Sequence, residues 1–321
     1  MKKAILSAPV LCARCLTVIS IVSLSAVVTT GQNTPSTPER TPDGRPDLQG
    51  VWSSATMTPL ERPKGFEDKP FFTEDEAKDF VNGLAERLLA KYGQVNIDTD
   101  GEPCDVWGEN RALLPGRRAS LIVDPPNGSI PLTAEARQRI EARPAADEFH
   151  LADPEALGLS ERCLMWGGGP PLTPVFYNNN FQIVQTSAYV VIATEMIHDA
   201  RVIPLDGRPH LPSTIRRWQG DPRGRWDGDT FVVDTTNFTT KTHFQGASEN
   251  LHIVERFTRR DAKTLLYEYT IDDPVAFTRP WTASQTMIRT DDRIFEYACH
   301  EGNQTPLLML RGARAQEQEK P

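Results

Sequence analysis

Ionisable side chains recur among strand-like runs in the second half of this 321-residue chain. Five of its six histidines lie beyond residue 197, in a region where tyrosines and carboxylates alternate with bulky apolar residues. In a partly buried pocket, histidine, tyrosine and carboxylate side chains can be tuned to exchange protons near neutral pH. We therefore expect general acid/base chemistry, with His198 and His252 as bases. The expected catalytic residues are His198, His252, His300, Tyr267 and Glu255.

A second set of side chains is expected to hold the substrate. Arginine binds anionic or hydroxyl-rich groups through several N–H donors, and tryptophan stacks on a flat ring. These residue types indicate a polyhydroxylated or aromatic small molecule as the partner. The expected substrate-binding residues are Glu195, Arg201, His210, Arg225, Arg279 and Trp281.

The stretch EMIHDARVIPLDGRPH, residues 195–210, supplies several of these groups directly after an apolar run. Glu195 and His198 are three positions apart, so on a regular strand they face opposite sides of the sheet. A bulge near Ile197 would be needed to bring them together.

Histidines can also bind metal ions, which is the alternative use of these side chains. No spacing of the His-Glu-x-x-His kind supports a metal site in this sequence. We therefore expect no metal ligands and no cofactor. If a metal were bound, its ligands would come from His198, His210, His252 and His300.

Elements that could position these groups follow one another from Phe181 onward, as short alternating or apolar runs separated by turn signals. Links such as WDGDT, RRDAKT and RTDDR are short enough for hairpins, so successive strands should be antiparallel neighbours. We expect a mainly β fold, an antiparallel meander forming a barrel or a sandwich, with a lipocalin-like barrel among the options. The expected strands are FQIVQT, YVVIATEMI, ARVIPL, TIRRWQG, DTFVVDTT, NLHIVERFTR, TLLYEYTID, TASQTMIRT and RIFEYAC.

Helical patterns elaborate the N-terminal half. LQGVW predicts a first strand, and SLIVD predicts a short later one. From Thr73 the spacing of apolar residues becomes helical, and Thr73 with Glu76 has the pattern of a capping box. A second helix should begin near Thr133, and TPLLMLRGARAQE predicts a terminal helix.

The first residues have the layout of a secretory signal, with Lys2 and Lys3 before an apolar run that ends in small residues. Arg14 interrupts the apolar run, so an uncleaved anchor is the alternative. No second apolar span follows, and we expect a periplasmic or secreted protein with no stable membrane span after signal cleavage. The expected organisation is a signal peptide (1–31), a flexible linker (32–47), an N-terminal strand with helical elaboration (48–170), a β-rich domain (171–315) and a polar tail (316–321).

Charge narrows the class of partner. The formal net charge of -8 at pH 7 argues against nucleic-acid binding, because affinity for phosphates depends on clustered Lys and Arg. A small-molecule ligand or substrate is therefore the expected partner, and the charge says nothing about the oligomeric state.

Export would permit disulfides among the three cysteines that follow the signal-like segment, Cys104, Cys163 and Cys299. Three cysteines leave one unpaired. We expect Cys163 to pair with Cys299, which would tie the start of the β-rich region to its last strand. A reactive thiol is the alternative.

Three motifs, EMIHDARVIPLDGRPH, GRWDGDTFVVDTTNF and EYACHEGN, resemble an uncharacterised family of secreted bacterial proteins. The resemblance covers about residues 46–315 and implies export and a common fold, without a known reaction. A weaker likeness is to lipocalin-type barrels, which have Gly-x-Trp on the first strand, as Gly50, Val51 and Trp52 here. The helical insertion between residues 73 and 143 departs from a simple lipocalin order.

Two functions fit these observations. The first is an exported enzyme of the lyase, isomerase or hydrolase type, acting by acid/base chemistry on a polyhydroxylated or aromatic small molecule. The alternative is a non-catalytic, lipocalin-like ligand-binding protein. We favour the enzyme, because so many ionisable groups among strands are costly to bury without a role. The enzyme requires residues from distant strands to line a single hollow.

Overall fold

The computed structural model describes residues 38–92, 112–142, 153–167, 169–242 and 244–319. The described residues belong to one compact unit that spans residues 36–321. The expected signal peptide and Cys104 lie outside the described residues. Within that described part of the chain, no helix has both the length and the apolar character needed to cross a membrane.

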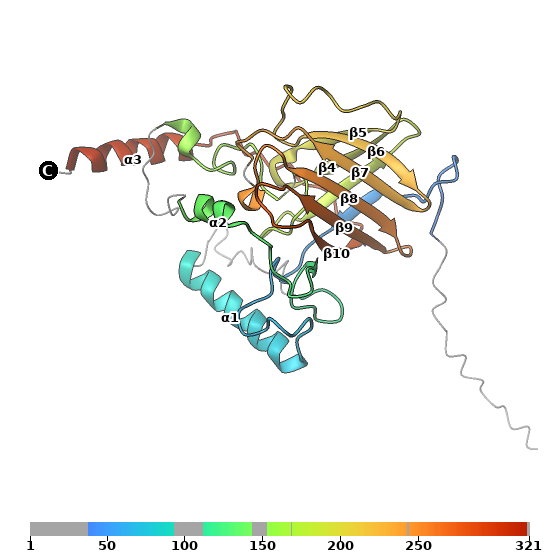
Figure 1. Ribbon diagram of the computed structural model, residues 1–321, viewed down its shortest axis with the longest axis horizontal. Helices are drawn as coiled ribbons and strands as arrows, with labels where there is room; N and C mark the ends of the chain where they lie inside the picture. Colours follow the sequence, from blue (N-terminus) through green and yellow to red (C-terminus); the bar gives the residue numbers. More distant parts are fainter. Residues whose placement is uncertain (1–37, 93–111, 143–152, 168, 243, 320–321) are drawn as a thin grey trace, which may run out of the picture. The chain divides into compact units, whose positions relative to one another are not determined.

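The described residues contain a sheet of ten strands, and every strand pairing in it is antiparallel. The order across the sheet is β5-β4-β3-β1-β10-β9-β8-β7-β6, and β2 pairs with β10. The expected mainly β, antiparallel fold is confirmed (Figure 1). The strands are β1 (Gly50–Ser53), β2 (Ile122–Asp124), β3 (Asn180–Gln185), β4 (Tyr189–Thr194), β5 (Ala200–Pro204), β6 (Asp221–Asp227), β7 (Thr230–Thr236), β8 (His252–Arg259), β9 (Thr264–Asp272) and β10 (Trp281–Thr290).

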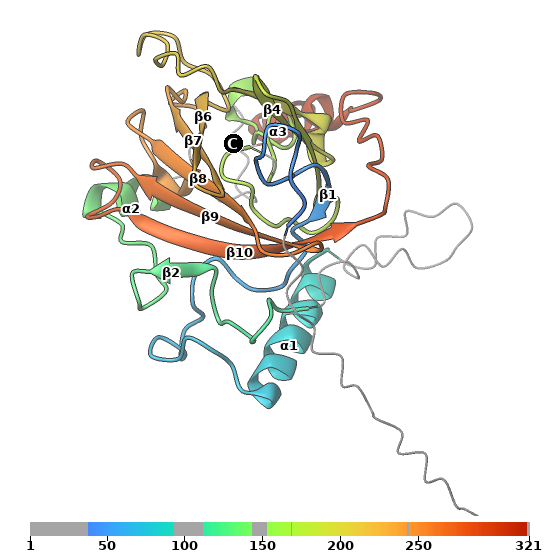
Figure 2. The same ribbon diagram turned by 90° about the vertical axis from the view of Figure 1, so that its right-hand side faces the viewer.

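The strands alternate between buried and more exposed residues, because successive side chains point to opposite faces of a sheet. On β8, Glu255 and Phe257 are fully buried, whereas His252 and Arg256 are partly exposed. Figure 2 shows that the sheet is strongly curved. The buried faces of its two halves look toward each other, because Arg201 on β5 contacts Glu255 on β8.

The two ends of the sheet, β5 and β6, approach each other without forming a ladder. Gly224 on β6 makes this approach possible. A Cβ atom at Gly224 would lie 2.6 Å from Leu205 Cδ2 and 2.9 Å from Ile203 Cγ2, closer than van der Waals contact allows. The sheet is therefore open in its hydrogen bonding, and its end strands meet through side-chain packing.

The first strand joins the two halves of the chain, since β1 pairs with both β3 and β10. Residues from 48–170 and from 171–315 thus share one sheet. Trp52 on β1 is fully buried, and its Nε1 donates to Leu48 O at 2.8 Å. Burying this ring on the inner face anchors the N-terminal segment in the core.

Three α-helices occur among the described residues: α1 (Glu74–Tyr92), α2 (Ala134–Glu141) and α3 (Thr305–Glu319). The capping box of α1 is confirmed, since Thr73 N donates to Glu76 Oε2 at 2.9 Å and Glu76 N donates to Thr73 Oγ1 at 3.2 Å. Thr133 caps α2 as expected, accepting from Ala136 N. The terminal helix is confirmed as α3.

Two expected strands are wrong, and one strand was not expected. TIRRWQG and RIFEYAC, residues 214–220 and 293–299, form no strand. Residues 293–299 are held instead by side chains at the end of β4 and by a disulfide. The unexpected strand is β6, whose Pro222 and Gly224 are typical of loops. An end strand tolerates proline because one of its edges needs no partner.

Candidate functional site

A buried ion pair lies on the inner face of the sheet. Arg201 Nη1 and Nη2 lie 3.0 and 2.5 Å from Glu255 Oε1 and Oε2. The two side chains are 1% and 0% exposed. Tyr267 on β9 donates from Oη to Glu255 Oε1 at 2.8 Å and accepts from Leu172 N at 2.9 Å. We call Arg201, Glu255 and Tyr267 the inner network; each of its members bonds another member and is closed off from solvent.

The surroundings shift the pKa values of Arg201 and Tyr267. Burial opposes the charge on Arg201, but the adjacent Glu255 carboxylate outweighs burial and raises the pKa of the guanidinium. Burial, with the negative charge of Glu255, raises the pKa of Tyr267 well above its usual value. Arg201 therefore stays charged and Tyr267 stays neutral around pH 7, which suits a structural network better than proton exchange.

Two histidines share a carboxylate on the outer face of the sheet. His252 Nε2 on β8 and His210 Nε2 each lie 3.1 Å from Oδ1 of Asp234 on β7. His210 Nδ1 also lies 3.2 Å from Oδ2 of Asp221. The side chains of His210, Asp234 and His252 are 29%, 28% and 37% exposed. These four residues form the outer cluster, which solvent reaches.

Hydrogen bonding tunes the outer cluster. The bond with Asp234 raises the pKa of His252 despite partial burial, and the bond with His252 lowers the pKa of Asp234. Burial opposes the charge on Asp221, but hydrogen bonds from Leu211 N, Arg223 and His210 outweigh it and lower the pKa. In the described part of the chain, no three His, Cys, Asp or Glu side chains are arranged to hold a metal ion. The hydrogen bond between them favours a protonated His252 imidazole next to an ionised Asp234 carboxylate.

An irregular turn, with Ile197 at φ 62°, separates Glu195 from His198. Glu195 is buried and accepts from Asn180 Nδ2 at 2.8 Å and from Phe295 N at 3.0 Å. His198 is exposed, and its Nδ1 lies 2.6 Å from Tyr297 O. Both residues therefore hold the segment that follows β10, each through a different backbone group.

The segment 293–303 also carries His300 and Cys299. The rings of His198 and His300 lie 6.1 Å apart between centroids. Cys299 forms a disulfide with Cys163, the pair expected from the sequence, although neither cysteine belongs to a strand. Asn303 Nδ2 adds a hydrogen bond of 2.9 Å to Glu161 O. The segment is thus fastened to the chain that precedes β3.

The other expected binding residues lie elsewhere. Arg225 is exposed on β6, and Arg279 is exposed and pairs with Asp124. Trp281 is fully buried on the inner face of β10. The expected site residues are therefore divided among the inner face, the outer cluster, the segment after β10 and the surface. The prediction that they line a single hollow is wrong.

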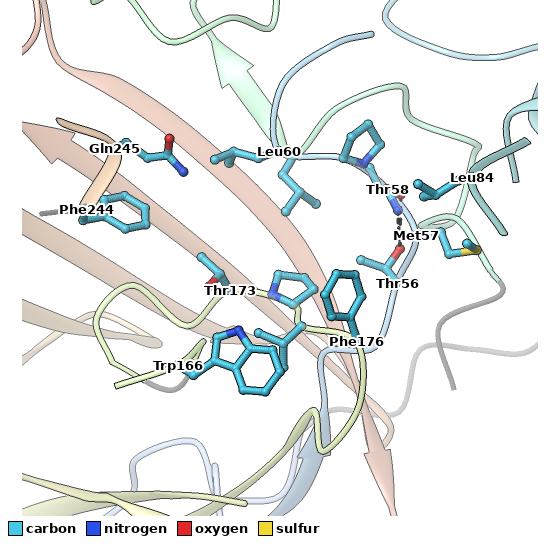
Figure 3. Close-up of a pocket in the computed structure, with 14 residues that line it drawn as sticks. Thr56, Met57, Thr58, Leu60, Leu84, Trp166, Thr173, Phe176, Phe244 and Gln245 are labelled. Atoms are coloured by element: carbon cyan, nitrogen blue, oxygen red, sulfur yellow. Dashed lines mark hydrogen bonds between the residues drawn. The ribbon is translucent and has the colours of Figure 1, made fainter. Parts of the chain in front are cut away.

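A cavity of about 380 Å³ lies in a different place, and none of its described lining residues belongs to a strand of the sheet (Figure 3). Its two main walls are residues 56–60 and 173–176. None of the expected site residues lines it. The other lining residues are Leu84 of α1, Leu121, Trp166, Phe244 and Gln245.

Backbone hydrogen bonds hold the first wall, and side chains hold the second. Met57 N donates to Ala112 O at 2.8 Å, and Leu121 N donates to Pro59 O at 2.7 Å. On the opposite wall, the Asn179 amide pairs with both backbone groups of Val175, at 2.8 and 3.0 Å. These irregular segments are therefore fixed in place without belonging to the sheet.

The described lining is mostly aromatic and aliphatic, with three threonines and one glutamine, and none of these residues is ionisable. Trp166 meets Phe176 edge to face, with ring centroids 6.5 Å apart. Phe244 stacks on the buried ring of Trp281 at 6.3 Å. Such walls can hold a flat ring by stacking and dispersion, and they offer no counter-ion for a charged ligand.

Sequence reasoning missed this cavity because its second wall lies in WGGGPPLTPVF, a glycine- and proline-rich stretch with the composition of a hinge. One signal was available. The stretch contains two aromatic and two aliphatic residues that follow neither a helical nor a strand period, and such side chains are stabilised by packing away from water.

No protein-family model, no curated protein and no solved structure matches this chain. The function must therefore be inferred from the geometry of the chain's own residues, above all from the contrast between the apolar cavity and the polar clusters.

Proposed function

We propose that this protein binds a neutral, flat and largely apolar small molecule in the cavity between residues 56–60 and 173–176. The observation that carries the proposal is a mostly apolar lining with three aromatic rings, in which none of the described residues is ionisable. Small-molecule sites are concave, mostly apolar and roughly 300–1,000 Å³ in volume, a range that includes this cavity. The proposal agrees with the alternative drawn from the sequence, a non-catalytic ligand-binding protein. Of the two kinds of small molecule expected there, polyhydroxylated or aromatic, it selects the aromatic kind.

The absence of charge in the described lining sets the chemistry of the ligand. An ion transferred into an apolar site without a partner loses its hydration and gains nothing in return. Thr173 and Gln245 offer a hydroxyl and an amide, which are enough to orient a ligand with one or two polar atoms. An anionic substrate held by arginine does not fit these walls.

We also propose that the protein acts outside the cytoplasm, in the periplasm or as a secreted protein. The Cys163–Cys299 disulfide supports this location, because such bonds persist in oxidising compartments. The signal-like layout of residues 1–31 agrees with it.

A pair of fluorescent probes tests the ligand class. N-phenyl-1-naphthylamine is flat and neutral, and 1-anilinonaphthalene-8-sulfonate has nearly the same rings with an added negative charge. We expect the neutral probe to bind at one site, and at least about tenfold more tightly than the charged one, because its rings need no counter-ion. Equal affinity for both probes, or no binding of the neutral probe, would contradict the proposal.

A matched pair of tryptophan variants locates the bound probe. Trp166 lines the cavity, whereas Trp218 is also half-buried but lies outside the lining. Trp166→Leu should weaken binding of the neutral probe by about tenfold through loss of ring contact, and Trp218→Leu should leave it nearly unchanged. Weakening by both variants, or by neither, would place the probe elsewhere.

The outer cluster favours a second candidate function, proton-transfer catalysis by an exported enzyme. Its support is the single carboxylate oxygen of Asp234, which two partly exposed imidazoles approach at 3.1 Å. Turnover of a panel of chromogenic aryl esters and glycosides tests it. This candidate predicts a rate that His252→Gln abolishes while the melting temperature hardly changes; a rate unchanged by the substitution removes the cluster from catalysis.

A further inference from the structure

The inner network ends on the chain that forms a wall of the cavity. Leu172 is fully buried, and both of its backbone groups are bonded to side chains of the sheet. Leu172 N donates to Tyr267 Oη at 2.9 Å, and Gln285 Nε2 donates to Leu172 O at 3.0 Å. The next residues, 173–176, line the cavity. The inner face of β9 and β10 therefore determines where this wall begins.

The direction of each hydrogen bond follows from the ion pair. Tyr267 has one hydroxyl proton, and Glu255 Oε1 accepts it at 2.8 Å. The lone pairs of the hydroxyl oxygen are then free to accept from Leu172 N. Arg201 holds the Glu255 carboxylate through both of its oxygens, so the acceptor for the Tyr267 proton cannot turn away.

We propose that Tyr267 and Gln285 are positioning residues for the cavity, fixing the wall of residues 173–176 through the backbone of Leu172. This inference rests on the proposed function, since it assigns the inner network to the ligand site. It also gives the buried charges a role. A buried ion pair adds little net stability by itself, but it can impose one geometry on the groups around it.

Neighbouring residues on the same inner face supply the test. Tyr267→Phe removes the acceptor for Leu172 N, and Gln285→Met removes the donor to Leu172 O at similar volume. Tyr269→Phe is the matched control: Tyr269 is equally buried two positions along β9, and its hydroxyl bonds to none of the described residues. The readouts are affinity for N-phenyl-1-naphthylamine and amide hydrogen exchange over residues 172–176, both measured well below each variant's melting temperature.

We expect Tyr267→Phe and Gln285→Met each to weaken probe binding by about five- to tenfold and to speed exchange over residues 172–176, because a buried backbone group loses its partner. Tyr269→Phe should change neither readout by more than about twofold. If Tyr267→Phe matches the wild type, or if Tyr269→Phe weakens binding equally, the positioning role is overturned.

The two proposals fail differently. If the wild-type protein does not bind the neutral probe, the proposed function falls. If the wild type binds the probe and the Tyr267 and Gln285 variants bind it equally well with unchanged exchange, only the positioning role falls.

Discussion

Glu255 and His252 lie three residues apart on β8 but in opposite environments. Glu255 faces inward, is fully buried and bonds Arg201 and Tyr267. His252 faces outward, is 37% exposed and shares Asp234 with His210. An odd spacing on a strand places two side chains on different faces. The alternation of side chains along β8 therefore places one ionisable residue in the buried inner network and another in the solvent-accessible outer cluster. Neither the network nor the cluster lines the cavity.

Removing the inner charge should have the largest effect on stability. Glu255→Gln removes the carboxylate that is hydrogen-bonded to the buried Arg201 guanidinium, so the free energy of unfolding should fall by about 3–5 kcal/mol in urea denaturation. The control on the outer side is Asp227→Asn, which breaks the exposed pair with Arg256 and should cost less than about 1 kcal/mol. An equal loss of unfolding free energy in the two variants would contradict the proposed difference between the inner and outer faces.

Removing the Cys163–Cys299 disulfide should have the next largest effect on the free energy of unfolding. It joins residues 136 positions apart and fastens the chain before β3 from outside, whereas the inner network holds it from inside. The double variant Cys163→Ser/Cys299→Ser should lose about 2–5 kcal/mol of unfolding free energy, since the unfolded chain gains freedom. A reducing agent should destabilise the wild type and leave the double variant unchanged. An equally stable double variant would mean that the inner contacts alone hold this segment.

The outer cluster should give a smaller, pH-dependent effect. The pKa of His252 is raised in the folded state, so its contribution is complete below about pH 6.5 and is lost as the pH rises through the raised value. The pKa of Asp234 is lowered, so its contribution is lost as the pH falls below about 4. Because His252 is partly exposed, the change should be about 0.5 kcal/mol or less. Unfolding free energies from pH 4 to pH 9 measure it, and His252→Gln should flatten the decline above pH 6.5. If the unfolding free energy of the variant still falls above pH 6.5, the pH dependence belongs to another titratable group.

The fold was largely predictable because most of its strands and helices follow from local sequence patterns. Alternation identified β8 and β9, and capping side chains located the starts of α1 and α2. The strand β6 was missed because Pro222 and Gly224 have loop character, and their place at the end of the sheet becomes evident only in three dimensions. Residues 293–299 alternate like a strand, yet the contacts with Glu195, His198 and Cys163 hold them in another conformation.

The candidate site was much less predictable. The alternation of side chains along β8 correctly predicted that His252 and Glu255 lie on opposite faces. That Arg201 reaches Glu255 across the interior could be known only from the order of the strands in the sheet. The cavity walls come from irregular segments more than 100 residues apart, 56–60 and 173–176, which no local pattern relates. The most chemically conspicuous residues were therefore found readily, whereas the apolar site was not.

We propose that the apolar cavity, and not the outer cluster with its two histidines, receives the ligand. A crystal structure of the protein with bound N-phenyl-1-naphthylamine tests it most directly. We expect the naphthyl ring between Trp166, Phe176 and Phe244, with its amine near Thr173 or Gln245. A ring bound against His210 and His252, with the cavity unchanged, would contradict it.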